Sequence, residues 1–290
     1  MIKFKKLFNP LVRLKKRIHS WERSRELTGL SVELLLQNPL RYDDVVISFT
    51  SIPSRLKITH LTVLSLFAQT HLPRKIVLWL HDDLKNKIPN SLSSLENEIF
   101  EIRFNDLNCS HRKLVNSLGD FSGDCIVTCD DDCMYDSDWL ENLYGTHLAY
   151  PQDVIGGKCR CITYNESGQL QPYKSWKYER RRGYSESNHM AVGYAGILYP
   201  PNSLMLDVTN RLLFLELAPH ADDLWFKAMS LLNGVHVRTS LEQLRDPIEI
   251  NRSQKVALRR ENTREDGNYR QWMRICEHYG ILASRVRGAS

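Results

Sequence analysis

The chain has 290 residues, of which 42% are hydrophobic and 25% are charged, and its formal net charge is +5. This composition allows one large hydrophobic core and excludes an intrinsically disordered chain. The apolar runs are shorter than the roughly 18 to 20 residues that a membrane-spanning helix needs, and the first residues lack the apolar centre of a signal peptide. We therefore expect a cytoplasmic protein with one main domain and terminal extensions.

The positive charge is concentrated at the N-terminus, where residues 1–25 carry a net charge of +8 and leave −3 for the remainder. Apolar side chains are interspersed with these cations: Ile2, Phe4, Leu7, Phe8, Leu11, Leu14, Ile18 and Trp21. This mixture predicts peripheral binding to an anionic membrane surface, and the alternative is a solvated leader with a few contacts to the domain. Pro10 is expected to interrupt any single helix here. The slightly acidic remainder argues against a nucleic-acid partner.

Strands and helices alternate along the first half of the chain. A short helix precedes Pro39, and apolar runs then predict strands at about 44–50 and within 74–83, 99–106 and 125–132. Helices are expected between them, within 58–70, 88–98 and 111–120. This alternation is typical of an α/β fold with a mostly parallel central sheet that is flanked by helices on both faces.

Polar residues follow each predicted strand. They are Thr50, Ser51 and Arg55 after the first strand, Asp82 and Asp83 after the second, Asn105 and Asp106 after the third, and Asp130, Asp131 and Asp132 after the fourth. Ligands of open α/β sheets bind beyond the carboxyl ends of the strands. We therefore expect all of these residues to converge on one edge of the sheet.

The second half is less regular. We predict a helix within 137–150 that is capped by Ser137, a strand within 153–164, and a long functional loop of polar and aromatic residues at 163–192. A strand within 192–201 and a helix within 202–217 follow. A second helix, within 218–234, begins with an acidic pair and ends at a glycine, and a terminal helix is expected within 259–282.

The three consecutive aspartates at 130–132 demand an explanation, because adjacent like charges repel unless a cation or full solvation offsets the repulsion. Asp130 and Asp132 alternate on an extended segment, and carboxylate oxygens suit hard divalent cations such as Mn²⁺ or Mg²⁺. The alternative is an acidic turn that caps the following helix.

Seven cysteines, an odd number without a secretion signal, argue against a disulfide framework. Cys129 and Cys133 bracket the aspartates, and Cys159 and Cys161 form a Cys-x-Cys pair. Either pair suggests a soft-metal site, but buried core thiols are an equally simple interpretation and no paired Cys-x-x-Cys knuckle is present.

Five motifs together resemble a known group of enzymes. They are "VISFTSIPSR", "HRKLVNSL", "VTCDDDCMYDSDWL", "GYAGILYPP" and "APHADDLWFKAM", and they occur in this order between roughly residues 44 and 240. This arrangement resembles the GT-A nucleotide-sugar glycosyltransferases, specifically the inverting family-2-like enzymes of bacterial surface polysaccharide (lipopolysaccharide or capsule) biosynthesis. A single Asp-x-Asp is a weak signal, whereas five motifs in order are a much stronger one.

The resemblance implies a GT-A (Rossmann-like) domain at 43–240, between a basic extension at 1–42 and a helical extension at 241–290. Its nucleotide-sugar half is expected at about 43–135 and its acceptor half at about 136–240. The expected activity is metal-dependent transfer of a sugar, from a UDP-sugar in our interpretation, to a glycan or lipid-linked saccharide. The expected location is the cytoplasmic face of the inner membrane.

Donor binding is assigned to the first half. A hard cation is needed at the diphosphate, whose charge grows as the glycosidic bond breaks, and Asp132 is our first choice of ligand, with Asp130 and Asp131 beside it. Thr50 and Ser51 would donate hydrogen bonds, and Arg55 would contact a phosphate or a base edge unless it pairs with Asp82 or Asp83. By resemblance, Asp82 or Asp83 contacts base and ribose, and Lys113 faces the donor. The alternatives are a solvated acidic turn and a surface lysine.

Acceptor activation is assigned by resemblance to the "HADD" stretch, with Asp223 as general base and Asp222 as its partner; the alternative is capping of the helix that follows. The family more commonly has Glu-Asp here, which leaves the choice between the two carboxylates open. Gly193, Gly196 and Trp225 would form the acceptor floor, and Trp176 is also assigned to acceptor binding, although Trp225 also fits a core. A loop containing Tyr173 and Trp176 would close over the donor, and His236 is a possible third metal ligand or a structural histidine.

Two other functions share these features. A metal-dependent phosphohydrolase or nucleotidyltransferase also uses aspartates at strand ends, and it would release inorganic phosphate or pyrophosphate. A non-catalytic membrane-associated scaffold has no need of Asp130, Asp132 and Asp223 in this arrangement.

Overall fold

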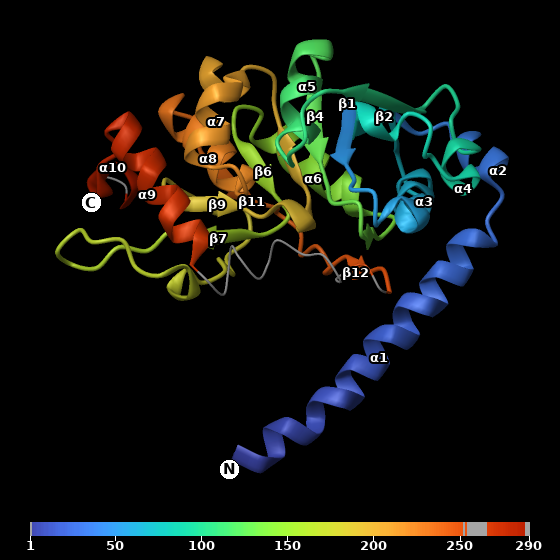
Figure 1. Cartoon of the computed structure of the whole chain (residues 1–290), viewed down its shortest axis with the longest axis horizontal. Coiled ribbons are helices and arrows are strands. Elements are labelled where there is room, and N and C mark those ends of the chain that lie inside the picture. The colour runs from blue at the N-terminus through green and yellow to red at the C-terminus, as the bar shows by residue number, and fades with distance from the viewer. Residues whose placement is uncertain (1, 252, 254–265, 288–290) are drawn as a thin grey trace.

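The computed structural model describes residues 2–251, 253 and 266–287 (Figure 1). Within these residues, eight strands form one sheet in the order β3-β2-β1-β4-β10-β6-β11-β8. Pairing is parallel from β3 through β4 and between β6 and β11, whereas β10 runs antiparallel to both of its neighbours and β8 runs antiparallel to β11. The strands are β1 (Arg41–Thr50), β2 (Leu72–His81), β3 (Phe100–Asn105), β4 (Cys125–Thr128), β6 (Val154–Gly156), β8 (Ser185–Glu186), β10 (Ile197–Tyr199) and β11 (Val237–Thr239). The predicted mostly parallel α/β sheet is confirmed.

Helices cover both faces of this sheet. The α-helices of the described chain are α1 (Ile2–Thr28), α2 (Val32–Leu36), α3 (Leu56–Phe67), α4 (Asn90–Ser93), α5 (Arg112–Asp120), α6 (Trp139–Ala149), α7 (Arg211–Leu217), α8 (Asp222–Leu232), α9 (Gly267–Tyr279) and α10 (Ala283–Arg287). One core packs against α3 and α6, and the other against α5, α7, α8 and α9.

The alternation of side chains along a strand explains the two cores. In β1, Val45, Ile47 and Phe49 point into the core with α3 and α6, whereas Val46 points into the core with α5 and α8. Because both faces are buried, the strand reads as a continuous apolar run rather than an alternating one. This is why the central strands were recognisable in the sequence.

Several predicted elements differ from those observed. Ser137 does not cap α6, because Asp138 occupies the N-cap position and makes no capping hydrogen bond with its side chain. The helix expected within 88–98 is only the short α4, and the strand expected within 153–164 is divided into β6 and β7 (Cys159–Cys161) by Gly157 and Lys158. The expected loop at 163–192 contains β8 and also β9 (His189–Ala191), which pairs antiparallel with β7.

The N-terminal helix α1 continues through Pro10, although a proline removes one backbone hydrogen bond and was expected to interrupt it. Among the side chains of α1 that the structure describes, those of Ser20 and Leu27, in the C-terminal part of the helix, are buried against the domain. The rest of the helix extends away from the body of the protein (Figure 1). In the part of the chain that the structure describes, no helix is both long and apolar enough to cross a membrane.

The segment after β11 returns to the carboxyl edge of the sheet. β12 (Ile248–Glu249) pairs antiparallel with β5 (Cys133–Met134), directly after the aspartates. The backbone N–H of Ile250 donates to the carbonyl of Asp132 at 2.8 Å, and Asn251 contacts both Ser20 and the carbonyl of Arg17 in α1. Of the terminal helix expected within 259–282, the structure shows α9, while residues 259–265 lie outside the described chain.

Gly196, just before β10, leaves no room for a side chain. Its φ of +92° is a conformation that side chains rarely adopt, and a Cβ there would lie 2.5 Å from the indole of Trp139. The same indole donates a hydrogen bond from Nε1 to the carbonyl of Ala195 at 2.9 Å. Gly196 therefore allows the backbone to pass directly over the Trp139 ring.

We predict that Gly196→Ala lowers the free energy of unfolding by at least about 2 kcal/mol, because it adds backbone strain and a steric overlap. Gly145→Ala is the matched control, since Gly145 lies on the exposed side of α6 with open space at its Cβ position. It should stabilise the protein by about 0.5–1 kcal/mol. Urea denaturation followed by circular dichroism measures both, and equal effects would contradict this account of Gly196.

Candidate active site

The loop after β1 is fixed by an arginine that the sequence analysis did not select. Arg112, at the start of α5, donates hydrogen bonds to the hydroxyl of Thr50, to the carbonyl of Ser51 at 2.7 Å and to the carbonyl of Leu107 at 2.9 Å. The Thr50 hydroxyl in turn donates to the carbonyl of Trp79 in β2 at 2.8 Å. The signal in the sequence was the "HRK" triplet, of which only Lys113 was chosen.

Arg55 holds the aspartate cluster rather than pairing with Asp82 or Asp83. Its guanidinium lies 2.7 Å from the Asp131 carboxylate and 3.1 Å from the Asp132 carboxylate. The two carboxylates raise the pKa of Arg55 although burial alone would lower it. The predicted alternative for Arg55, an ion pair with the acids after β2, is therefore wrong.

The three aspartates have different environments. Asp131 is buried and structural: its carboxylate accepts from the Ser51 hydroxyl and from Arg55, and its carbonyl accepts from Thr62. Asp132 is also buried, and burial together with the charge of Asp130 raises its pKa to about 6. Asp130 is the open member, with 36% of its side chain exposed. The carboxylates of Asp130 and Asp132 are the two that could hold a cation, and that of Asp132 also contacts Arg55.

Lys113 joins this cluster to the acidic pair of the second half. The residue is 5% exposed, and its ammonium lies 2.9 Å from the carboxylate of Asp222 and 3.5 Å from that of Asp130. Three neighbouring carboxylates, those of Asp222, Asp130 and Asp223, raise the pKa of Lys113 despite its burial. The lysine is therefore a buried cation between the aspartates and α8.

Asp222 and Asp223 respond to Lys113 in opposite ways. Burial would raise both pKa values, but the ion pair with Lys113 lowers that of Asp222. Burial and the charge of Asp222 raise the pKa of Asp223 to about 7. One oxygen of Asp223 accepts a hydrogen bond from the backbone N–H of Gly193 at 2.9 Å, and a Cβ on Gly193 would contact both Asp223 and the Lys113 ammonium.

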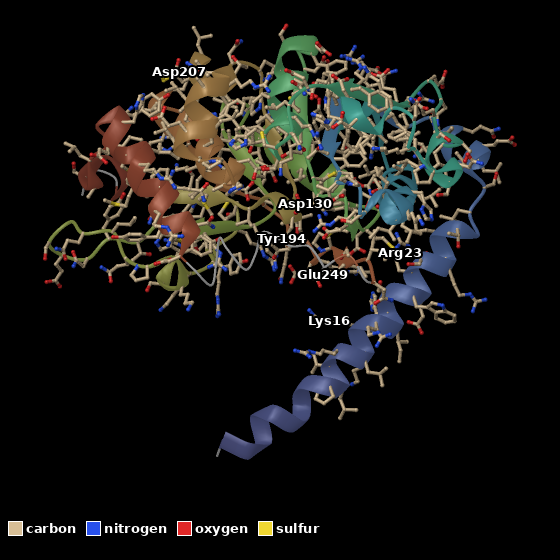
Figure 2. All side chains as sticks on the ribbon, viewed as in Figure 1. Lys16, Arg23, Asp130, Tyr194, Asp207 and Glu249 are labelled. Carbon is tan, nitrogen blue, oxygen red and sulfur yellow. The ribbon has the colours of Figure 1, made fainter. Side chains whose placement is uncertain are left out.

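A tyrosine connects the two halves of the site. The hydroxyl of Tyr135 accepts a hydrogen bond from the backbone N–H of Asp130 and donates one to the carbonyl of Tyr194, both at 3.0 Å. Tyr135 is fully buried and its ring contacts that of Trp139. Asp130 and Tyr194 accordingly lie on the same edge of the domain, the side toward which α1 extends (Figure 2).

Other residues selected from the sequence are placed differently. The indoles of Trp225 and Trp176 are fully buried and donate to the carbonyls of Val208 and Gln171, so the structure places both in the core and not on an acceptor surface. The alternative interpretation of Trp225 as a core residue fits the structure.

Three more selected residues lie at the sheet ends. Asp82 pairs with Lys85, and the exposed Asp83 contacts His81; both follow β2 at the same edge as Asp130. His236 is exposed and precedes β11, at the opposite edge of the sheet, where its carbonyl accepts from the N–H of Val154. The structure does not bring His236 to the aspartates, and its assignment as a metal ligand was wrong.

Each of the seven cysteines is a free thiol. Cys129 and Cys133 are buried beside the aspartates, and burial raises the pKa of each well above its usual value. This favours the prediction of core thiols over that of a soft-metal pair around the aspartates.

The fold, the aspartates at the edge of the sheet and the acidic pair on α8 together define an α/β protein of the GT-A type. A model of the family described as "Glycosyl transferase family 2" matches residues 55–206, slightly more than half of the chain. The chain belongs to glycosyl transferase family 2. The matched range contains Lys113 and the three aspartates and ends before Asp222 and Asp223.

Comparisons with solved structures and with curated protein sequences give no further support for a particular function. A solved structure described as CMP:2-keto-3-deoxy-manno-octonic acid synthetase in complex with CTP is 13% identical, with a TM-score of 0.39; the match covers 69% of this chain and 88% of that chain. No curated protein sequence matches the chain.

We predict opposite stability effects for the two neighbouring acids of α8. The folded-state pKa of Asp223 is raised, so the stability of the folded protein falls as the pH rises toward about 7 and this carboxyl ionises. At pH 8, Asp223→Asn should therefore raise the free energy of unfolding by roughly 1–3 kcal/mol. Asp222→Asn should lower it by roughly 2–4 kcal/mol, because the buried Lys113 loses its nearest partner.

Chemical denaturation at pH 5 and pH 8, without any ligand, measures these effects. The gain from Asp223→Asn should shrink at pH 5, where the parent carboxyl is protonated. A loss of stability in both variants at pH 8 would show that Asp223 is an ordinary stabilising helix cap.

Proposed function

We propose that the protein transfers a sugar from a nucleotide-sugar donor, a UDP-sugar, to a glycan or lipid-linked saccharide acceptor. Membership in glycosyl transferase family 2 supports the use of a nucleotide sugar. The observation that carries the proposal is the position of Asp223, a half-buried residue with one buried carboxylate oxygen and a raised pKa, in the same Lys113-centred cluster as Asp130. A general base with a pKa near the working pH is what sugar transfer requires of this position.

Asp130 and Asp132 would hold the divalent cation, Mn²⁺ or Mg²⁺, that this chemistry calls for. The donor set fits such an ion, because carboxylate oxygens are the ligands of hard cations and the charge of Asp130 already raises the pKa of Asp132. A bound divalent cation neutralises the charge that develops on the diphosphate. Asp131 has a different role, since its contacts with Ser51 and Arg55 fix the orientation of the cluster.

The donor would lie along the edge formed by the loop after β1 and the acids after β2. Arg112 holds this loop through Thr50 and Ser51, so the loop is a rigid border for a nucleotide. Asp82, which is partly exposed at the end of β2, is suited to accept hydrogen bonds from the base and the ribose of the nucleotide. The diphosphate then reaches Asp130 and the cation.

Asp223 would take the proton of the attacking acceptor hydroxyl. The hydroxyl oxygen forms a bond to the anomeric carbon while the glycosidic bond to the diphosphate breaks, and the bonding electrons leave with the nucleoside diphosphate. Attack from the face opposite the leaving group inverts the configuration. Asp222 stays ionised beside Lys113, so the geometry favours Asp223 as the base and Asp222 as the group that positions Lys113.

We predict that Asp223→Asn lowers sugar transfer by at least about a hundredfold, the scale of a lost general base, while donor affinity stays within a fewfold of the parent. In the parent, the transfer rate should fall as the pH drops below about 7, because protonated Asp223 cannot accept a proton. Asp132→Asn should instead abolish metal-dependent donor binding. Calorimetric titration with UDP and Mn²⁺, and chromatography of the products over pH 5–9, measure these effects.

Asp138→Asn is the control, since Asp138 is exposed and its side chain makes no capping bond. Full transfer by Asp223→Asn together with lost transfer by a folded Asp222→Asn would identify the neighbour as the base. Unchanged transfer in both would refute catalysis by these acids. Release of pyrophosphate, rather than nucleoside diphosphate, would support a nucleotidyltransferase instead.

We also propose that α1 binds the protein to an anionic membrane surface. Leu11, Leu14, Ile18 and Trp21 lie on one face of the helix and are 46–60% exposed. The helix packs on the domain through a different face, that of Ser20 and Leu27. Basic residues flank the exposed stripe, as in helices that lie in the membrane interface. Asn251 links α1 to the segment beside Asp132, so a membrane-bound α1 would stay next to the active edge.

For α1 we predict that the combined change Leu11→Ser, Leu14→Ser and Ile18→Ser reduces binding to vesicles of phosphatidylcholine and phosphatidylglycerol at least about tenfold, because it removes buried apolar area. The control replaces three other exposed leucines, at 34, 206 and 212, with serine and should bind like the parent. Sedimentation measures both, and added salt should weaken parental binding. Equal loss in the control would exclude a specific role for the α1 stripe.

A further inference from the structure

A group of metal-ligating side chains lies outside the candidate active site, in the segment that leads to Gly193. Cys161, Glu179 and His189 each offer one ligand atom, and these atoms all lie within 4.8 Å of one another. The three residues come from separate extended segments. Cys161 is directly opposite His189 in the β7–β9 pair, and the segment around Tyr178 lies along the other edge of β7.

The backbone pairing explains why the three side chains meet. Side chains directly opposite each other in an antiparallel pair lie on the same face, so Cys161 and His189 share a face. On the other side of β7, the N–H of Glu179 donates to the carbonyl of Cys159, and the N–H of Cys161 donates to the carbonyl of Lys177. This register puts Glu179 on the face of Cys159 and therefore also on that of Cys161, two residues farther along the strand.

His189 is the second observation that points to a ligand. Its side chain is completely buried, Nδ1 has no hydrogen-bond partner, and Nε2 lies 3.3 Å from an oxygen of Glu179. A buried imidazole with so few polar partners is costly. Coordination by Nε2 would let His189 and Glu179 share one metal ion.

The Glu179 carboxylate is already oriented for such a contact. One oxygen accepts hydrogen bonds from the backbone N–H groups of Arg180 and Arg181 at 2.8 Å and from the Arg181 side chain at 3.0 Å. The other oxygen accepts from Arg181 at 2.6 Å and faces the imidazole and, at 4.0 Å, the thiol of Cys161. A carboxylate oxygen has two lone-pair directions, so this second oxygen can bind a metal while Arg181 keeps it in place.

We propose that Cys161, Glu179 and His189 bind a transition-metal ion of the Zn²⁺ type, with a fourth position open to water. One thiolate, one imidazole and one carboxylate form a ligand set that favours zinc over the oxygen-seeking Mn²⁺ or Mg²⁺. The aspartate cluster has the opposite preference. The site also differs from the cysteine pairs considered from the sequence, since it uses one cysteine from the Cys-x-Cys pair and two residues from distant segments.

Because this site lies close in sequence to Gly193, metal binding there would affect the structure of the active edge. Metal binding would tie the two ends of the 162–188 segment together at β7 and β9. β9 ends at Ala191, and only Val192 separates it from Gly193, whose N–H holds Asp223. A metal at His189 would therefore fix the strand that positions the base.

Cobalt(II) titration of the full chain tests the site, because thiolate-bound Co²⁺ has a charge-transfer absorption that oxygen ligands do not give. We expect one equivalent of Co²⁺ to produce this absorption and Zn²⁺ to abolish it. Cys161→Ser should remove it. Glu179→Gln should retain it while lowering Zn²⁺ affinity at least about tenfold in competition with a coloured chelator.

Two controls locate the metal. Cys276→Ser removes another partly buried thiol and should leave the absorption intact. Asp132→Asn disables the aspartate cluster, beside which Cys133 lies, and should also leave it intact; this control makes the test independent of the transferase proposal. In the parent, Zn²⁺ should protect Cys161 from alkylation by iodoacetamide, which mass spectrometry of the digested protein detects without any variant.

Three results of the cobalt titration would overturn the proposal. They are the absence of a thiolate absorption at equimolar Co²⁺, an unchanged absorption in Cys161→Ser, and its loss in Asp132→Asn with retention in Cys161→Ser. The last result would place the metal between Asp132 and Cys133. Alkylation of Cys161 at the same rate with and without Zn²⁺ would refute the site as well.

Discussion

The buried ammonium of Lys113 is the interaction on which the rest of the site depends. It is the cation shared by Asp130, at the end of β4, and Asp222, at the start of α8. Removing one member of such a buried group leaves an uncompensated charge, which is far costlier than the loss of a surface ion pair. The lysine therefore fixes the distance between the aspartate cluster after β4 and the acidic pair of α8.

The Lys113 ammonium also affects the pKa values of its neighbouring carboxylates to different extents. Asp222 is close enough to Lys113 for the ion pair to outweigh burial, whereas for Asp223 burial and the charge of Asp222 prevail. Arg55 divides the aspartates in a similar way, since it contacts Asp131 and Asp132 while Asp130 stays open toward solvent. Adjacent carboxylates whose environments push their pKa values apart are a recurring means of assigning acid and base roles.

The sequence predicted those features that depend on neighbouring residues. Apolar runs located β1, β2, β3 and β4, and the rule that ligands gather at the carboxyl ends of parallel strands brought the right acids to one edge. The resemblance of its motifs to family-2-like enzymes also led to the selection of Lys113, Asp222 and Asp223 individually. Their pairing was not predictable, because Lys113 and Asp222 are 109 positions apart in the sequence and their contact depends on the strand order.

The errors have physical causes as well. Trp176 and Trp225 were expected on an acceptor surface because aromatic rings bind sugars, but large rings also fill cores, and their indole N–H groups found backbone carbonyls there. His236 was misplaced because the direction of β11 was unknown. Ser137 has a residue type that is common at helix N-caps, but it lies one position before Asp138, which is the observed N-cap residue.

The antiparallel strand β10 explains how the second half reaches the active edge. A strand that runs parallel to β4 would begin at the far edge of the sheet and bring only its carboxyl end to the aspartates. Because β10 runs in the opposite direction, Ile197 is paired with Thr128, so the residues just before β10 arrive at the edge where β4 ends. Those residues include Gly193, which holds Asp223, and Tyr194, which accepts the hydrogen bond of Tyr135. The reversal of a single strand thus places the backbone at 193–194 within hydrogen-bonding reach of Asp223 and Tyr135, and the positive φ of Gly196 is the local condition that lets the chain turn into that strand.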